Sequence, residues 1–157
     1  NNLSTNDLDV LIHQSIEIKN KIVLQDPTEN GIRKALNFGH TLGHAIESYL
    51  LENENKNPLL HGEAIAIGMI LESYLSLQKN LISNNEYQEI KYIISDIFEQ
   101  VNFTREDIEK IIELLIHDKK NEFGKVQFAL LDKIGNVKIN QFIDNELIFS
   151  AFEDYKN

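Results

Sequence analysis

Apolar and polar residues alternate along this chain with a period that predicts a mainly helical protein. In six segments the apolar side chains recur at intervals of three and four residues, which places them on one face of an α-helix. Four of these segments are preceded by Ser4, Ser83, Thr104 or Asp144, residue types that cap helix N-termini. The predicted helices cover residues 5–23, 32–51, 61–79, 84–100, 105–116 and 145–155.

The remaining pattern completes the expected fold. Residues 125–131 and 137–139 flank the turn-forming residues 132–136 and predict a short β-hairpin. Within the helix over 61–79, residues 64–71 are all apolar or glycine, which indicates burial on most sides. The fold class is therefore mainly α, a multihelical domain with one small β-hairpin near the C-terminus.

Composition narrows the class of protein. A chain of 157 residues with 42% hydrophobic and 25% charged residues is expected to form one globular domain over 1–157. Its net charge of -10 argues against nucleic acid as a partner, and the lack of any apolar run of about 20 residues argues against a membrane. The absence of cysteine excludes thiolate chemistry and agrees with a cytoplasmic location. Because the chain does not begin with methionine, we expect it to be part of a longer protein.

Histidines and glycines are concentrated in one region. His40 and His44 are four residues apart, so on a helix they share a face and could bind one metal ion. Gly39 and Gly43 would each cost a helix about 1 kcal/mol relative to alanine, which indicates that something approaches closely there. Tight packing of two helices is the alternative explanation for these glycines.

A polar stripe extends this region. Arg33, Asn37, His40 and His44 follow one another at helical spacing, an arrangement that suits an anionic substrate beside a metal ion. His61, at the start of the next predicted helix, suits a metal or anion contact, or it simply occupies a cap position. If these residues form a site, the helix of His61 must pack antiparallel or obliquely against that of His40, with the two rings about 3–5 Å apart.

Two motifs resemble the 3-dehydroquinate synthase family. They are RKALNFGHTLGHAIE over residues 33–47 and LHGEAIAIGM over 60–69. The likeness covers the helical C-terminal domain, and the spacer over 48–59 is longer than in many members. It implies an enzyme of the shikimate pathway that converts 3-deoxy-D-arabino-heptulosonate 7-phosphate to 3-dehydroquinate and phosphate, for aromatic amino-acid biosynthesis.

The resemblance also implies roles for individual residues. His40 and His61 would be metal ligands, with zinc as the expected ion and cobalt as the alternative. The implied catalytic and substrate-contacting residues are Lys19, Glu29, Arg33, Asn37, His44 and one or both of Lys119 and Lys120. Taken without the resemblance, the two lysines at the end of the helix over 105–116 are explained first as surface charges that complement its dipole, and a contact to a phosphate is the alternative.

NAD is the second cofactor that the resemblance implies. The NAD-binding domain and a third metal ligand, a glutamate, would lie upstream of these residues, and no glycine-rich phosphate loop occurs here. We therefore expect this chain alone to bind zinc weakly and to be inactive, and the full-length enzyme to be a homodimer. Two alternatives remain open: another sugar-phosphate cyclase, such as a 2-deoxy-scyllo-inosose or valiolone-type synthase, and a non-catalytic helical binding module.

Overall fold

The computed structural model describes residues 4–118 and 126–157. The chain divides into two compact units, residues 1–36 and 37–157, which are described separately. The single domain that the chain length predicts stays a prediction. Lys119 and Lys120 lie outside the described residues.

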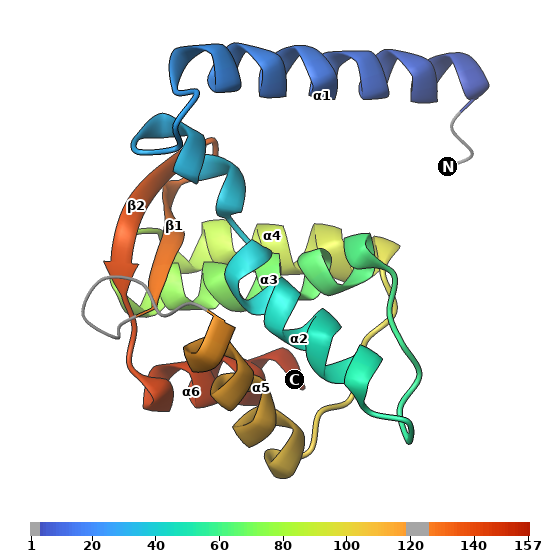
Figure 1. The fold of residues 1–157 in the computed structure, drawn as a ribbon, viewed down its shortest axis with the longest axis vertical. Coiled ribbons are helices and arrows are strands. Elements are labelled where there is room, and N and C mark those ends of the chain that lie inside the picture. Colours follow the sequence, from blue (N-terminus) through green and yellow to red (C-terminus); the bar gives the residue numbers. More distant parts are fainter. Residues whose placement is uncertain (1–3, 119–125) are drawn as a thin grey trace. The chain divides into compact units, whose positions relative to one another are not determined.

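The first unit is dominated by helix α1, Thr5–Gln25 (Figure 1). Its N-terminus has the predicted capping box: Ser4 Oγ accepts a hydrogen bond from the Asp7 N–H, and the Asp7 carboxylate accepts one from the Ser4 N–H. The short 3₁₀ helix η1, Ile32–Asn37, follows a loop and ends at the boundary of the unit.

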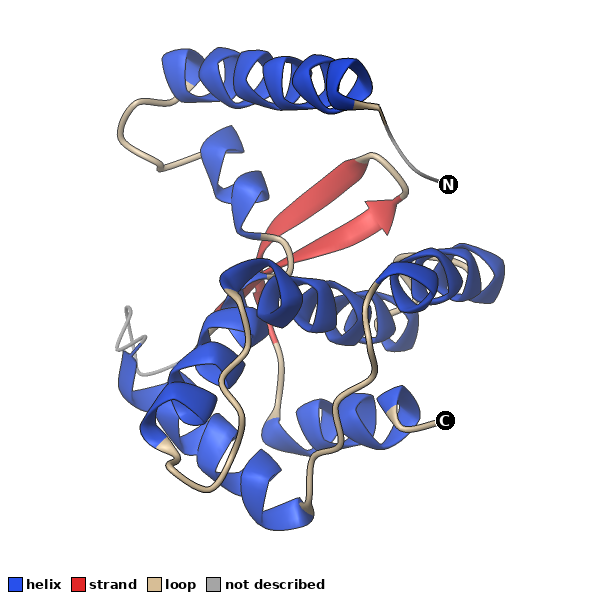
Figure 2. Ribbon diagram, turned by 90° about the vertical axis from the view of Figure 1, so that its right-hand side faces the viewer, coloured by secondary structure: helices blue, strands red, loops and turns tan. Residues whose placement is uncertain are grey.

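Helix α3, His61–Gln78, is the centre of the second unit (Figures 1 and 2). It contacts α2 (His40–Glu52), α4 (Asn84–Ile97), α6 (Asn145–Tyr155) and strand β1 (Gln127–Lys133). These neighbours cover it on several sides, which explains why its apolar residues are not confined to one face and confirms the predicted burial.

The other elements close this core. Helix α5, Arg105–Asp118, packs against α2 and α6. Strand β2, Asn136–Phe142, pairs antiparallel with β1 through a turn in which Gly135 has a φ of 86°. The predicted fold class, multihelical with one small β-hairpin near the C-terminus, is confirmed.

One predicted element is wrong. The segment 32–51 is not a single helix, because η1 ends at Asn37 and α2 begins only at His40. Gly39 lies between them with a φ of 80°, a left-handed conformation that interrupts an α-helix. Glycine spacing alone did not distinguish a residue inside a helix from one that precedes it.

A buried carboxylate joins the far end of α2 to α5. Asp107 is 4% exposed, accepts a hydrogen bond from the Tyr49 hydroxyl, and forms an ion pair with Lys56 at 2.8 Å. It also completes a cap at the start of α5, where its side chain accepts from the Thr104 N–H. Desolvation raises the pKa of Asp107, but the hydrogen bonds from Lys56, Tyr49 and Thr104 together outweigh it and hold the pKa well below its usual value.

We expect Asp107→Asn to lower the free energy of unfolding at pH 7 by about 2 kcal/mol, because the amide leaves Lys56 without its charged partner. A carboxyl whose pKa is lowered by folding stabilises the fold above its unfolded pKa, and this contribution is lost as the pH falls toward the folded pKa. The variant should therefore lose less stability than the wild type between about pH 5 and pH 2. Urea unfolding of both proteins at about pH 5 and about pH 2 measures the two losses of stability. Equal losses in the wild type and the variant would contradict the prediction.

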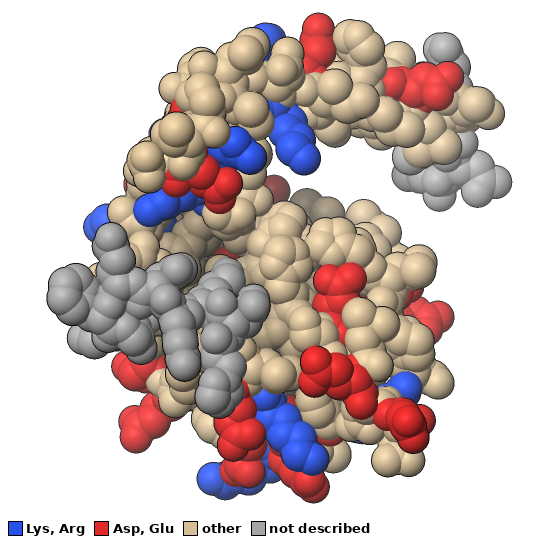
Figure 3. All heavy atoms as spheres, viewed as in Figure 1, with Lys and Arg blue, Asp and Glu red and all other residues tan. Residues whose placement is uncertain are grey.

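Two exposed ion pairs lie on the outer face of α5. Arg105 pairs with Glu109 at 3.1 Å and Lys110 with Glu106 at 2.9 Å, both at a spacing of four residues. Figure 3 shows acidic and basic side chains interspersed at this end of the unit. Exposed pairs of this kind stabilise a protein by less than about 1 kcal/mol each, so the packed core carries the fold.

Candidate metal centre

Three glycines allow α2 and α3 to approach each other closely. A Cβ atom added to Gly68 of α3 would lie 2.0 Å from the carbonyl oxygen of Gly39, and one added to Gly43 of α2 would lie 3.0 Å from the carbonyl oxygen of Ala64. Real Cβ atoms essentially never lie under 3.0 Å from another atom, and a contact at 3.0 Å is tighter than nine in ten real Cβ contacts. Close helix packing therefore explains the glycines, as one of the two sequence interpretations proposed.

The direction of the helices follows from which residues meet. Gly39 lies against Met69, and Gly43 lies against Ile65. One turn further along α2, the Glu47 carboxylate meets the ring of His61. Successive contacts thus advance along α2 and retreat along α3. The prediction of antiparallel or oblique packing is confirmed, and this order of contacts brings the first residue of α3 beside the middle of α2.

This packing gathers three imidazole rings. The ring centroids of His40 and His61 are 5.8 Å apart, those of His40 and His44 are 5.3 Å apart, and those of His44 and His61 are 5.5 Å apart. One ring nitrogen from each histidine lies within 4.8 Å of the others. Nitrogens that share a tetrahedral zinc ion each lie about 2.0–2.1 Å from it and hence about 3.3–3.4 Å from one another, so the side chains of this set would have to move closer to bind one ion.

Two of the rings are oriented through their second nitrogen. His40 Nδ1 lies 3.1 Å from the Phe38 carbonyl oxygen, and His61 Nδ1 lies 3.0 Å from Glu47 Oε2. Both oxygens accept hydrogen bonds, so each Nδ1 is the donor, and the neutral form of each ring then offers the lone pair of Nε2 to another partner. Metal-binding histidines in proteins are held in this way, by a carbonyl or carboxylate on the nitrogen that does not bind the metal.

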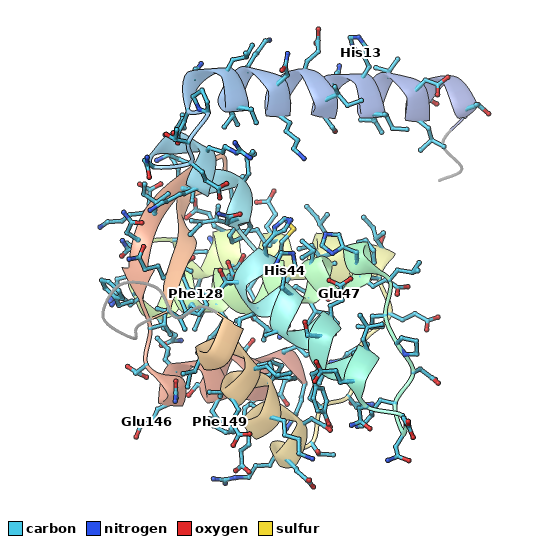
Figure 4. The ribbon with its side chains drawn as sticks, viewed as in Figure 1. His13, His44, Glu47, Phe128, Glu146 and Phe149 are labelled. Carbon is cyan, nitrogen blue, oxygen red and sulfur yellow. The ribbon has the colours of Figure 1, made fainter. Side chains whose placement is uncertain are left out.

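Glu47 contacts the histidine cluster and was not singled out in the sequence analysis. It projects from the same helix as His44 (Figure 4). The signal was present in the motif, because Glu47 follows His44 by three residues and His40 by seven, which places all three on one helix face. Its side chain is 23% exposed and that of His61 is 55% exposed, so the pair lies at the rim of the cluster.

The other predicted residues do not extend this cluster as one helical stripe. Because the helix is interrupted at Gly39, the predicted stripe of Arg33, Asn37, His40 and His44 on one helix face is wrong. Asn37 ends η1, whereas both histidines are on α2.

Three of the predicted site residues, Lys19, Glu29 and Arg33, belong to the first unit. Lys19 lies on the exposed surface of α1. The guanidinium of Arg33 lies 3.4 Å from the Glu29 carboxylate and donates a hydrogen bond to the Pro27 carbonyl oxygen at 3.0 Å. Arg33 and Glu29 are thus ion-paired with each other.

Asp26 organises the loop that carries Arg33 and Glu29. Its carboxylate accepts hydrogen bonds from the N–H groups of Asn30, Gly31 and Arg33. Desolvation raises the pKa of Asp26, but these three hydrogen bonds outweigh it and the pKa is lowered. The carboxylate therefore stays ionised and fixes the backbone of this loop.

Comparison with known families identifies a match over most of the chain. The model of the 3-dehydroquinate synthase C-terminal family matches residues 1–121. That range contains all three clustered histidines, Glu47 and the loop of Arg33.

Curated relatives carry the same name. A 3-dehydroquinate synthase from Parabacteroides distasonis is 42% identical over 95% of this chain and 42% of its own length. Another from Campylobacter concisus is 34% identical over 99% of this chain and 44% of its own length. The chain thus spans less than half of these relatives.

Solved structures share the fold. A 2-deoxy-scyllo-inosose synthase complexed with carbaglucose-6-phosphate, NAD+ and Co2+ has a TM-score of 0.76 and 25% identity, over 97% of this chain and 42% of its own. A 2-epi-5-epi-valiolone synthase from Streptomyces hygroscopicus with NAD+ and Zn2+ bound has a TM-score of 0.75 and 18% identity, over 98% of this chain and 41% of its own. The second likeness concerns the fold alone.

Proposed function

Because the chain belongs to the 3-dehydroquinate synthase C-terminal family, we propose that it is the metal- and substrate-binding part of a 3-dehydroquinate synthase. The reaction is the conversion of 3-deoxy-D-arabino-heptulosonate 7-phosphate to 3-dehydroquinate and phosphate in the shikimate pathway. The observation that carries the proposal is the convergence of His40, His44 and His61, from two helices, within 4.8 Å.

The donor set fits a divalent metal ion. His40 and His61 are the proposed ligands, each through Nε2, because Phe38 and Glu47 hold the Nδ1 protons. Zinc is the expected ion and cobalt the alternative. When bound, the ion supplies a Lewis acid that polarises a substrate oxygen. Glu47 keeps the proton of His61 on Nδ1, which maintains the tautomer that can bind a metal.

His44 is proposed as a substrate contact, the role that the resemblance implies. Its distance from the other two rings also allows it to take a coordination position. The two roles differ in what removal of the ring would do, since a ligand supports metal content whereas a substrate contact does not. The His44→Ala variant described below separates them.

The remaining proposed site residues would bind the charged groups and the hydroxyls of the substrate. A guanidinium can bind a carboxylate or phosphate through two parallel hydrogen bonds, and Arg33 is the proposed carrier of that role. In the metal-binding unit, Asn37 is the proposed contact to a substrate hydroxyl. The further residues proposed in the site are Lys19, Glu29, Lys119 and Lys120.

NAD is proposed as the second cofactor, bound mainly outside this chain. The 2-deoxy-scyllo-inosose synthase and the valiolone synthase described above are complexes with NAD+ and with Co2+ or Zn2+, which supports the pairing of a dinucleotide with a divalent ion. A homodimer in the cytoplasm is the proposed form of the full-length enzyme. No helix in the described part of the chain is long and apolar enough to cross a membrane.

An assay of the full-length protein that carries this chain tests the proposal. We expect phosphate release from 3-deoxy-D-arabino-heptulosonate 7-phosphate in the presence of NAD+ and zinc, and none from the present chain alone. Glucose 6-phosphate is the matched comparison, since it is the sugar counterpart of the carbaglucose-6-phosphate bound by the inosose synthase. Release from glucose 6-phosphate alone would identify another sugar-phosphate cyclase, and release from neither would favour a binding module.

A further inference from the structure

Helix α2 begins without a side-chain cap of its own. Its N-cap position is Gly39, which has no side chain to accept a hydrogen bond from the first turn. The first N–H groups of a helix have no partners inside the helix, and leaving them unpaired in a buried place is unfavourable. Gly39 and Leu42 are both buried, so their N–H groups require an acceptor from elsewhere in the fold.

Glu72 of α3 supplies that acceptor. Its Oε2 accepts a hydrogen bond from the Gly39 N–H at 2.7 Å, and its Oε1 accepts one from the Leu42 N–H at 3.1 Å. The side chain is fully buried, with 0% exposure. A carboxylate buried this deeply is retained only where hydrogen bonds and favourable charge compensate its desolvation, and the N-terminus of a helix provides both.

A second residue on the same face of α3, Gly68, contacts the other peptide group of this turn. Gly68 precedes Glu72 by one helical turn, so both point toward α2. The backbone of Gly68 lies against the carbonyl group of Gly39, while Glu72 binds the N–H group of Gly39. The peptide units on both sides of Gly39 are thereby fixed relative to α3.

That turn contains the proposed metal ligand His40 and the carbonyl group that orients its ring. His40 directly follows Gly39, and Phe38, whose carbonyl oxygen accepts from His40 Nδ1, directly precedes it. The position of Gly39 therefore determines both where the His40 ring starts and which way it is turned. His61 is the first residue of α3, and the orientation of its ring is fixed separately, by the hydrogen bond to Glu47.

We infer that Glu72 is a positioning residue for the metal centre, since its carboxylate fixes the Phe38–Gly39–His40 turn and so aims His40 at His61. The inference rests on the proposed function, because it gives this buried carboxylate a role in metal binding. Glu72 contacts neither the metal nor the substrate in this scheme. It acts only through the backbone of α2.

The test is the metal affinity of the full-length protein with Glu72→Gln. An amide can accept from only one of the two N–H groups and presents its own NH2 to the other, so the turn shifts. We expect the affinity for Zn2+, measured by competition with a chelator, to fall by about 10–100-fold, as for other residues that orient metal ligands. The visible absorption spectrum of the Co2+-loaded protein should change as well, because it reports the geometry of the ligands.

Asp107→Asn is the matched control. It makes the same change of acid to amide in another buried residue that caps a helix, and Asp107 contacts neither the histidines nor their hydrogen-bond partners. It should lower stability and leave the affinity for Zn2+ and the Co2+ spectrum unchanged. An equal loss of metal affinity in this control would overturn the inference, since general destabilisation would then explain both variants.

A second variant covers the case in which Glu72→Gln does not fold. Glu72→Asp keeps the charge but is one methylene shorter, so it cannot reach both N–H groups, and a smaller fall in Zn2+ affinity is expected. Wild-type affinity in whichever folded variant is tested would overturn the inference. A wild-type protein that itself binds no metal would overturn the proposed function instead, which keeps the two failures distinguishable.

Discussion

His61→Ala in the full-length enzyme should lower turnover by at least about 100-fold and remove most of the bound metal. The ring is one of two proposed ligands and stands at the exposed start of α3, so its removal takes away a coordination position without disturbing the core. Steady-state turnover and metal content after dialysis against a mild chelator are the measurements. The midpoint of thermal unfolding of the metal-free protein should stay close to that of the wild type.

His44→Ala is the comparison for this variant, because it removes an equally placed ring from the same cluster. It should keep its metal and lose catalytic efficiency, kcat/KM, because weaker substrate binding raises KM. Loss of metal in His44→Ala to the level of His61→Ala would make His44 a ligand. Near-normal turnover and metal content in His61→Ala would show that the metal assignment is wrong.

Gly68→Ala is expected to lower the free energy of unfolding by about 3 kcal/mol or more. The added methyl group would lie 2.0 Å from the Gly39 carbonyl oxygen and 2.8 Å from the Gly43 nitrogen, both of which are backbone atoms that move only if the helices separate. Separation would expose part of the core between α2 and α3. Denaturant unfolding at neutral pH measures the loss.

Gly62→Ala provides the control on the same helix. A Cβ atom at Gly62 meets nothing within 4 Å, so the substitution should be neutral or stabilise by up to about 1 kcal/mol through the higher helix propensity of alanine. If Gly62→Ala destabilised the protein as much as Gly68→Ala, the close approach of α2 and α3 would not explain the loss, because Gly62 lies outside that contact.

Local signals in the sequence predicted where several of the helices begin. Ser4 and Ser83 form the expected capping boxes with Asp7 and Glu86, and Asp144 caps α6. In each case the residues that cap the helix lie within three positions of one another, so the sequence contains the whole interaction. The apolar run at the start of α3 likewise predicted a helix surrounded by others.

Interactions between distant parts of the chain were not predictable in this way. The interruption at Gly39 depends on Gly68 and Glu72, which follow it by 29 and 33 residues. A glycine at helical spacing has the same appearance in sequence whether it sits inside a helix or before one. The partnership of Glu47 with His61 depends on the register between α2 and α3, and that register is set by packing rather than by any local pattern.

The arrangement of the three histidines does not depend on the length of the connection between α2 and α3. This connection is tethered where Lys56 meets Asp107 at α5, and it carries none of the three clustered histidines. Their spacing is set by the contact of the two helices, so insertions in this connection are absorbed at the surface. The same property makes it a natural place for an insertion, and a short flexible peptide placed between residues 54 and 55 would leave the histidines in register.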